Sequence, residues 1–192
     1  MKGSLQGGNH MDNGASSYRR FLDGEEEAFD EIMKELFHGL VYFINRYVQD
    51  LHTAEDLAID SLSDLIVHPK RYNFQTTLKT YLFMIGRSRA LDYIKRKKII
   101  HFTELSEANM LEDFAALEEN ILADQRKKAV HDAIAKLPGD MAEAVYLIYF
   151  EELSYQDAGT IMKKSRKQVD NLLYRAKKEL RNILGEDGEQ LL

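Results

Sequence analysis

The sequence contains no cysteine, only two prolines and no long apolar run among its 192 residues. The absence of cysteine excludes disulfide bonds and thiolate metal sites, and it fits a reducing cytoplasm, where we expect the protein to reside. The scarcity of proline and of β-branched runs favours an all-α fold. No apolar stretch approaches the roughly 18 residues that a membrane-spanning helix needs, so we expect no membrane insertion.

The remaining composition is typical of a folded, water-soluble protein. Apolar residues make up 44% of the chain and charged residues 30%, and the formal net charge is −6. These proportions argue against intrinsic disorder, and the length allows one domain or two small ones. The start of the chain lacks the apolar segment of a signal peptide. We interpret residues 1–17 as a disordered or vector-derived leader.

Helical periodicity divides the rest of the chain into two units. In the first unit, predicted helices cover residues 20–50, 53–68 and 77–98. Gly24 and Gly39 are expected to break or bend the first of these helices, and Thr53 is expected to cap the second. In the second unit, predicted helices cover residues 121–137, 140–150, 155–162 and 166–184.

An acidic stretch separates the two units, since residues 103–124 carry carboxylates but no lysine or arginine. We interpret it as a linker. The predicted all-α architecture is therefore two small helical domains joined by an acidic linker. Its segments are the leader 1–17, a first domain 18–100, the linker 101–120, a second domain 121–185 and a tail 186–192.

The end of the second domain has the pattern of a helix-turn-helix. Ser154 and Ser165 can each cap a helix, with Asp157 and Gln168 three residues later, and only "KKS" separates the two helices. The second helix is two-faced, with an inward apolar stripe of Val169, Leu172, Leu173, Ala176 and Leu180. Its other faces gather positive charge in an otherwise acidic protein. The alternative is an ordinary amphipathic hairpin with a solvated basic face.

The exposed faces of that helix carry side chains that suit DNA. Asn171 and Arg175 belong to the residue types that pair two-pronged with adenine and guanine edges in the major groove. Lysines nearby are suited to phosphates. The predicted DNA-binding set is Arg166, Lys167, Gln168, Asp170, Asn171, Tyr174, Arg175, Lys177 and Lys178.

Two further patterns lie in the first domain. Basic residues and aromatics alternate along 77–98 and end in "KRKK", a combination that suits single-stranded nucleic acid, although rings such as Tyr81 and Phe83 can equally belong to the core. The helix expected over 53–68 combines carboxylates with apolar residues. Such a helix repels DNA and suits a protein partner with basic and apolar patches.

Two stretches resemble the extracytoplasmic-function (ECF, group IV) subfamily of the sigma-70 family of bacterial RNA polymerase sigma factors. "AEDLAIDSLSDLIVHPKRYNFQTTLKTYLFMIGRSRALDYIKRKK" resembles the second region of that family. "LPGDMAEAVYLIYFEELSYQDAGTIMKKSRKQVDNLLYRAKKELRNIL" resembles the fourth region. The two motifs occur in the family's order with a short linker between them. The resemblance implies binding to core RNA polymerase and to promoter DNA, with an anti-sigma factor as inhibitor in trans.

The resemblance also implies roles for particular residues. Those expected to contact core polymerase are Glu55, Asp56, Leu57, Asp60, Leu62 and Leu65. Those expected near the −10 promoter element are Asn73, Arg87, Ser88, Arg89, Asp92, Lys95 and Arg96. The helix-turn-helix set given above would enter the major groove at the −35 element.

The chain departs from the family pattern at several of these positions. Ile59 stands where glutamine is frequent, and Ser88 where asparagine is common. At the helix-turn-helix corner, Lys163 and Lys164 replace the usual glycine and apolar residue. Asp170 replaces a frequently basic residue; because an acid accepts a hydrogen bond from cytosine N4, the preferred −35 sequence is expected to differ from the common one.

Nothing in the sequence indicates an enzyme. The six histidines are scattered without metal-ligand spacing, and neither a phosphate-binding glycine loop nor a nucleophile motif is present. We therefore expect no catalytic activity, no metal and no cofactor. One alternative remains a helix-turn-helix regulator that acts without polymerase. The other is a protein-interaction module whose basic faces bind an acidic partner.

Overall fold

The computed structural model describes residues 14–101, 130 and 132–184. Within these ranges the regular structure is entirely helical, as predicted. Most of the expected leader, the expected linker, most of the helix expected over 121–137 and nearly all of the tail lie outside the described residues. The prediction of where each domain begins and ends therefore stays a prediction.

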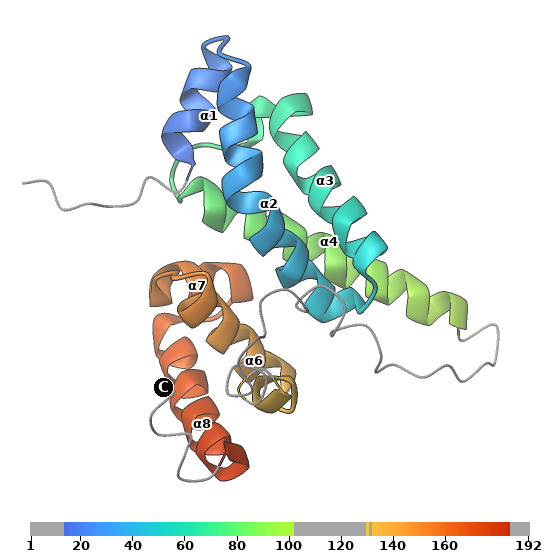
Figure 1. Cartoon of the computed structure of the whole chain (residues 1–192), viewed down its shortest axis with the longest axis vertical. Coiled ribbons are helices and arrows are strands. Elements are labelled where there is room, and N and C mark those ends of the chain that lie inside the picture. Colours follow the sequence, from blue (N-terminus) through green and yellow to red (C-terminus); the bar gives the residue numbers. More distant parts are fainter. Residues whose placement is uncertain (1–13, 102–129, 131, 185–192) are drawn as a thin grey trace, which may run out of the picture.

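Four helices and a short turn form the first unit (Figure 1). They are α1 (Ala15–Leu22), α2 (Glu27–Val48), α3 (Leu51–Val67), the 3-10 turn η1 (Pro69–Arg71) and α4 (Leu78–His101). Helix α2 packs against α1, α3 and α4. The fully buried side chains between them include Leu36, Leu40, Phe43, Ile44, Leu62, Leu65, Leu78, Leu82 and Phe83.

Two of the predicted helix boundaries in this unit are wrong, and one is right. Gly24 lies between α1 and α2 with φ of 101°, a conformation that glycine adopts without strain. Gly39 was expected to break or bend the helix, and since it lies inside α2 it does not break it. The N-cap of α3 is Asp50, not Thr53, because the Asp50 carboxylate accepts from the Thr53 backbone N–H at 2.7 Å.

In the second unit the structure describes helical residues at 130 and 132–135, then three labelled helices and one π-helical turn. The labelled elements are α6 (Gly139–Val145), η2 (Tyr146–Phe150), α7 (Tyr155–Met162) and α8 (Arg166–Leu184). The observed bounds of α7 and α8 agree with the prediction. The pattern expected over 140–150 is helical but changes to a π-turn at Tyr146, which periodicity alone does not reveal.

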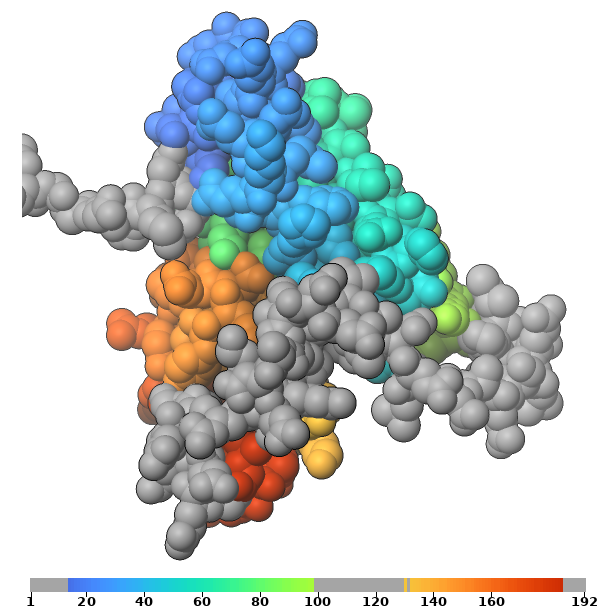
Figure 2. Space-filling view, in the orientation of Figure 1, coloured from blue at the N-terminus to red at the C-terminus, as the bar shows by residue number. Residues whose placement is uncertain are grey.

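The two units lie against each other. Helix α7 contacts α4, although far separated from it in sequence. In the space-filling view, the segment around α7 (orange) adjoins α2 and the start of α4 (Figure 2). Fully buried Phe43 of α2 also stacks on Tyr146 of η2 with ring centroids 6.1 Å apart. The sequence left the relative arrangement of the units open.

Candidate nucleic-acid interface

Reciprocal side-chain hydrogen bonds fix the start of α8. The Ser165 hydroxyl accepts from the Gln168 backbone N–H at 3.2 Å, and the Gln168 side-chain oxygen accepts from the Ser165 N–H at 2.7 Å. This is a complete capping box. At α7, Ser154 likewise accepts from the Asp157 N–H at 3.1 Å. Both caps were predicted, and together they define a short, rigid corner.

At this corner, the backbone that follows α7 lies very close to the backbone of α7 itself. Lys163 ends α7 in the left-handed region with φ of 56°. The Lys164 N–H then donates to the Gly159 carbonyl at 2.8 Å. A Cβ at Gly159 would meet the Lys164 carbonyl oxygen at 2.6 Å. This approach is the reason for a glycine inside α7, a position where glycine costs about 1 kcal/mol relative to alanine.

Replacing Lys163 by glycine is expected to raise the free energy of unfolding by about 1 kcal/mol. The reason is that a side chain in the left-handed region clashes with its own backbone, whereas glycine does not. Urea denaturation would measure the change. The control is Lys178→Gly in the exposed middle of α8, which is expected to lower stability by about 1 kcal/mol. Equal losses in both variants would contradict the assigned strain at the corner.

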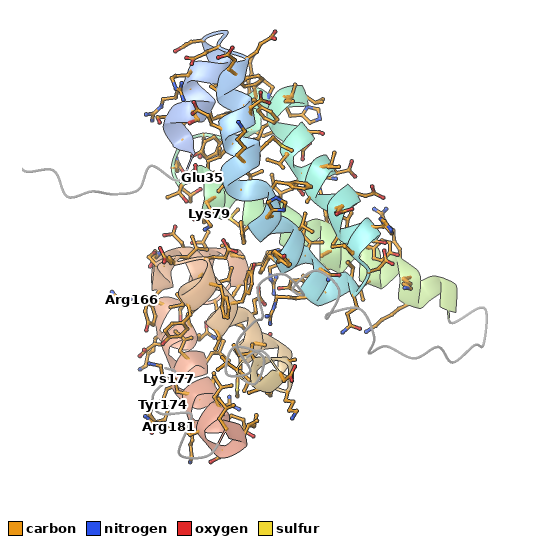
Figure 3. The ribbon with its side chains drawn as sticks, viewed as in Figure 1. Glu35, Lys79, Arg166, Tyr174, Lys177 and Arg181 are labelled. Carbon is orange, nitrogen blue, oxygen red and sulfur yellow. The ribbon has the colours of Figure 1, made fainter. Side chains whose placement is uncertain are left out.

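Helix α8 buries one face and exposes the rest. Val169, Leu173, Ala176 and Leu180 are buried, as the apolar stripe predicted, and Leu172 is half-buried. The predicted reading residues Asp170, Asn171, Tyr174 and Arg175 are all exposed, Tyr174 at 73%. The remaining exposed members of the predicted set are Arg166, Lys167, Gln168 and Lys178. Figure 3 shows Arg166, Tyr174, Lys177 and Arg181 along the outer side of α8.

Lys177 differs from the other predicted DNA contacts because its ammonium lies against an aromatic ring. Its ammonium lies 5.5 Å from the ring centroid of Tyr149, and it is half-buried. A hydrogen bond with Tyr149 raises the pKa of Lys177 above its ordinary value. The ammonium is therefore fixed against η2. Nothing in the sequence pattern indicates this contact, since Tyr149 falls within the helix predicted over residues 140–150.

A surface hollow lies where α7 meets the start of α8. Tyr155, Arg166, Lys167 and Asp170 line it. Arg166 and Lys167 bring positive charge to the hollow, while Asp170 places one carboxylate beside them. The hollow thus brings two side chains predicted to contact phosphates beside one predicted to read a base.

The second predicted surface lies on α4 and on the loop before it. Ser88, Asp92, Lys95 and Arg96 are exposed, and Asn73 in the loop is exposed as well. The Asn73 side-chain oxygen accepts from the Gln75 N–H at 3.1 Å, which shapes the loop. Leu91 is 40% exposed. Helical spacing predicts an apolar stripe on this helix that consists of Leu78, Tyr81, Leu82, Ile85, Leu91 and Ile94, and the exposure of Leu91 shows that its place in this stripe is wrong.

Two arginines predicted for the −10 surface are engaged elsewhere. Arg89 lies between α3 and α4 and donates to Asp64 Oδ2 at 2.9 Å. Arg87 donates through Nε to Glu143 Oε1 of α6 at 2.8 Å. In this structure both guanidiniums pair with carboxylates of the protein, so neither belongs to the exposed basic surface of Lys95 and Arg96, and their expected contact with the −10 element stays a prediction. The sequence pattern does not distinguish an arginine that faces DNA from an arginine that faces a carboxylate on a neighbouring helix.

Helix α3 presents an acidic and apolar face. Among the predicted polymerase contacts, Asp56 and Asp60 are exposed, and Glu55 and Leu57 are half-buried. The other two members need correction, because Leu62 and Leu65 are only 2% and 1% exposed and belong to the core. Three other apolar side chains are exposed on this helix. Ile59 was noted in the sequence as a departure from the family pattern, whereas Ile66 and Val67 were missed.

No cluster of histidine, aspartate and glutamate suited to a metal ion occurs in the described residues. Nor is any described helix both long and apolar enough to cross a membrane.

Comparison with known families accounts for both units. The family "Sigma-70 region 2" matches residues 19–99, and the family "Sigma-70, region 4" matches residues 127–180. Together the matches span well over half of the chain. The ECF RNA polymerase sigma factor SigM of Bacillus subtilis is 26% identical over 155 residues, covering 80% of this chain and 93% of that protein. The RNA polymerase sigma-H factor of Pseudomonas aeruginosa is 26% identical over 176 residues, covering 86% and 90%.

Solved structures of similar fold include two complexes. One is the sigma factor RpoE in complex with the anti-sigma factor NepR from Bartonella quintana, with a TM-score of 0.63, 21% identity and coverage of 83% of this chain and 98% of that chain. Another is CnrH in complex with the cytosolic domain of CnrY, with a TM-score of 0.61, 15% identity and coverage of 91% and 99%. Two family matches in the expected order, on two helical units with the expected fold, lead to one conclusion: the chain belongs to the extracytoplasmic-function subfamily of the sigma-70 family of bacterial RNA polymerase sigma factors.

Proposed function

We propose that this chain brings bacterial core RNA polymerase to promoters by reading two DNA elements, the −35 element with α8 and the −10 element with α4 and the loop before it. The observation that carries the proposal is the reading face of α8. Helix α8 follows a corner and begins with a complete capping box. Its residues Asp170, Asn171, Tyr174 and Arg175 are all exposed. A helix presented in this way fits the major groove.

The side chains on α8 suit particular bases. Asn171 can pair two-pronged with adenine, and Arg175 with guanine. The Asp170 carboxylate can accept a hydrogen bond from the N4 amino group of cytosine. Because the carboxylate would repel a phosphate, we expect Asp170 to contact a base and not the DNA backbone. The lysines and Arg166 would contact the phosphates and set the register of the helix on the duplex.

The −10 surface has a different composition, which suits separated strands. Lys95 and Arg96 supply charge for the DNA backbone near the end of α4. Asp92 and Ser88 supply hydrogen bonds about one and two turns earlier, respectively, and exposed Leu91 adds an apolar contact for an unstacked base. Charge combined with apolar contact is the usual way to hold single-stranded nucleic acid.

The same proposal includes the protein's binding partners, its location and its lack of catalytic activity. The acidic and apolar face of α3 would dock on core polymerase, and the protein would work in the cytoplasm as a non-catalytic subunit, with polymerase performing the chemistry. An anti-sigma factor would inhibit it in trans. The structures of RpoE with NepR and of CnrH with CnrY support that last point by analogy.

Reversing two charges on α3 tests the polymerase contact. The double variant Asp56→Lys, Asp60→Lys is expected to bind core polymerase at least about tenfold more weakly, since like charges replace complementary ones across the interface. Fluorescence anisotropy with purified core polymerase would measure the change. The control is Glu26→Lys, Asp30→Lys, two exposed acids on or next to α2. Equal affinities for both double variants would exclude α3 as the docking face.

A further inference from the structure

We propose that Tyr149 is a positioning residue for DNA binding: it fixes the Lys177 ammonium at one edge of α8, where that ammonium binds a phosphate of the duplex that α8 enters. Tyr149 belongs to the π-helical turn η2 and to neither helix of the helix-turn-helix. The inference rests on the proposed function, because it explains how one contact of the −35 surface is prepared. It adds to that surface a residue from outside α8.

The π-helical turn carries Tyr149 away from the core. A regular helix would place Tyr149 on the face of Val145 and Met141, which precede it by about one and two turns and are only 2% and 7% exposed. The chain instead widens at η2, where the Glu151 N–H donates to the Tyr146 carbonyl at 3.1 Å. Tyr149 is 40% exposed. This local departure from the α-helix brings the Tyr149 ring to the side of η2 that meets α8.

The contact between Tyr149 and Lys177 restricts a long, flexible side chain. The Lys177 ammonium lies 5.5 Å from the Tyr149 ring centroid, inside the ~6 Å range of cation–π attraction. A hydrogen bond with the Tyr149 hydroxyl raises the pKa of Lys177, so the ammonium stays charged at neutral pH. A free lysine loses rotamer freedom when it binds a phosphate, whereas Lys177 has lost that freedom before DNA arrives. Its contact with DNA is therefore stronger than that of an unrestrained lysine.

An aromatic ring fixes the ammonium without neutralising it. Other lysines of this protein are fixed by carboxylates: Lys79 lies 2.7 Å from Glu151, and Lys164 lies 3.0 Å from Asp140. Within the part of the chain that the structure describes, no carboxylate pairs with Lys177. Its positive charge is therefore available to an anion outside the protein, and each phosphate of a DNA duplex carries one negative charge.

Lys177 lies on the edge of α8 that continues from the surface hollow. Arg166, Asp170, Lys177 and Arg181 are spaced by four, seven and four residues, which is the spacing of one stripe along a helix. Arg166 and Asp170 line the hollow beside α7. Figure 3 shows Arg166, Lys177 and Arg181 in that order along this side of α8. A DNA strand that passes the hollow along this edge would meet Lys177 about two helical turns beyond Asp170.

A double-variant cycle tests whether Tyr149 acts through Lys177. The probe is a duplex fragment with a start site that depends on this protein, bound by the protein together with core polymerase. Tyr149→Leu should weaken binding about three- to tenfold, because the ammonium must then be ordered when DNA binds. Adding Tyr149→Leu to Lys177→Ala should cause no further loss. Equal losses in the two backgrounds, or unchanged affinity in either single variant, would overturn the inference.

Salt dependence separates positioning from a general disturbance of α8. Lys177→Ala should lower the slope of log affinity against log salt by about 0.9, the value of one phosphate contact. Tyr149→Leu should lower it by no more than that. Core polymerase contributes equally to every slope, so differences between variants report α8. A larger drop in Tyr149→Leu would mean that several contacts are lost together, and Tyr149 would then have only a structural role.

Two further variants are matched to Tyr149→Leu. Tyr149→Phe keeps the ring and should lose less affinity than Tyr149→Leu. Phe150→Leu changes the adjacent ring, which is 54% exposed, and should bind DNA as the parent does. Circular dichroism would establish that all variants fold. A loss of DNA affinity in Phe150→Leu equal to that in Tyr149→Leu would assign the effect to the packing of η2 and overturn the inference.

An uncharged phosphate analogue locates the contact on the DNA. Methylphosphonate placed at successive positions of the fragment should weaken binding of the parent at one position where it has no effect on Lys177→Ala. At that position Tyr149→Leu should be affected less than the parent. Absence of any such position would overturn the inference alone. A parent protein without any start site of its own would contradict the proposed function itself, and Tyr149 would then have no DNA contact to prepare.

Discussion

Replacing both Asn171 and Arg175 by alanine is expected to lower transcription from this protein's promoters at least about 30-fold. Each side chain is exposed on α8 and can make a two-pronged base contact worth about 1–3 kcal/mol. The loss of both contacts removes about 2–6 kcal/mol, and about 1.4 kcal/mol corresponds to a factor of ten. Run-off transcription with saturating core polymerase would measure the change.

A matched variant separates base reading from general DNA affinity. Lys178→Ala removes a single exposed charge from the same helix. It should weaken binding similarly on all sequences and reduce the salt dependence, without altering which promoters are used. Affinity for core polymerase should remain unchanged in every α8 variant. Wild-type transcription by the Asn171, Arg175 double variant would show that α8 does not read the promoter.

Phe43→Ala is expected to lower the free energy of unfolding by about 3–5 kcal/mol. The Phe43 ring is fully buried, and its centroid lies 5.0 Å from that of Phe83. Its contact with Tyr146 adds a second unit to the packing around it. Removing the ring leaves a cavity in the core of the first unit. Chemical denaturation followed by far-ultraviolet circular dichroism would give the difference.

Phe150→Ala provides the comparison for Phe43. Phe150 is 54% exposed and stacks on Tyr146 at a centroid distance of 5.6 Å. Truncating it should cost no more than about 1 kcal/mol, since it removes one ring pair and little buried area. If the two truncations destabilised the protein equally, the core would not be centred where the structure places it.

The parts of the molecule that the sequence predicts well are those set by local interactions. The bounds of α7 and α8 follow from the Ser154 and Ser165 caps, which bond to residues only three positions away. The inward stripe of α8 follows from helical periodicity alone. A family resemblance then assigned roles to these elements, and the family matches over both units support it.

The parts that could not be predicted depend on contacts between distant segments. Periodicity gives the faces of α4 but not the neighbour that covers each face, so Arg87 and Arg89 were both assigned to DNA. It likewise cannot tell a surface leucine from a core one, which explains the errors at Leu62, Leu65 and Leu91. Gly39 was interpreted as a break because the residue it accommodates, Glu151, is far away in sequence.

The most direct test of the central claim is transcription by sigma-free core polymerase with and without this protein on a library of genomic fragments, followed by sequencing of RNA 5′ ends. The account predicts discrete start sites that depend on the protein and share paired upstream motifs at the spacing of the −35 and −10 elements. Salt-sensitive duplex binding without any protein-dependent start site would contradict it, and would instead indicate a DNA-binding regulator that acts without polymerase.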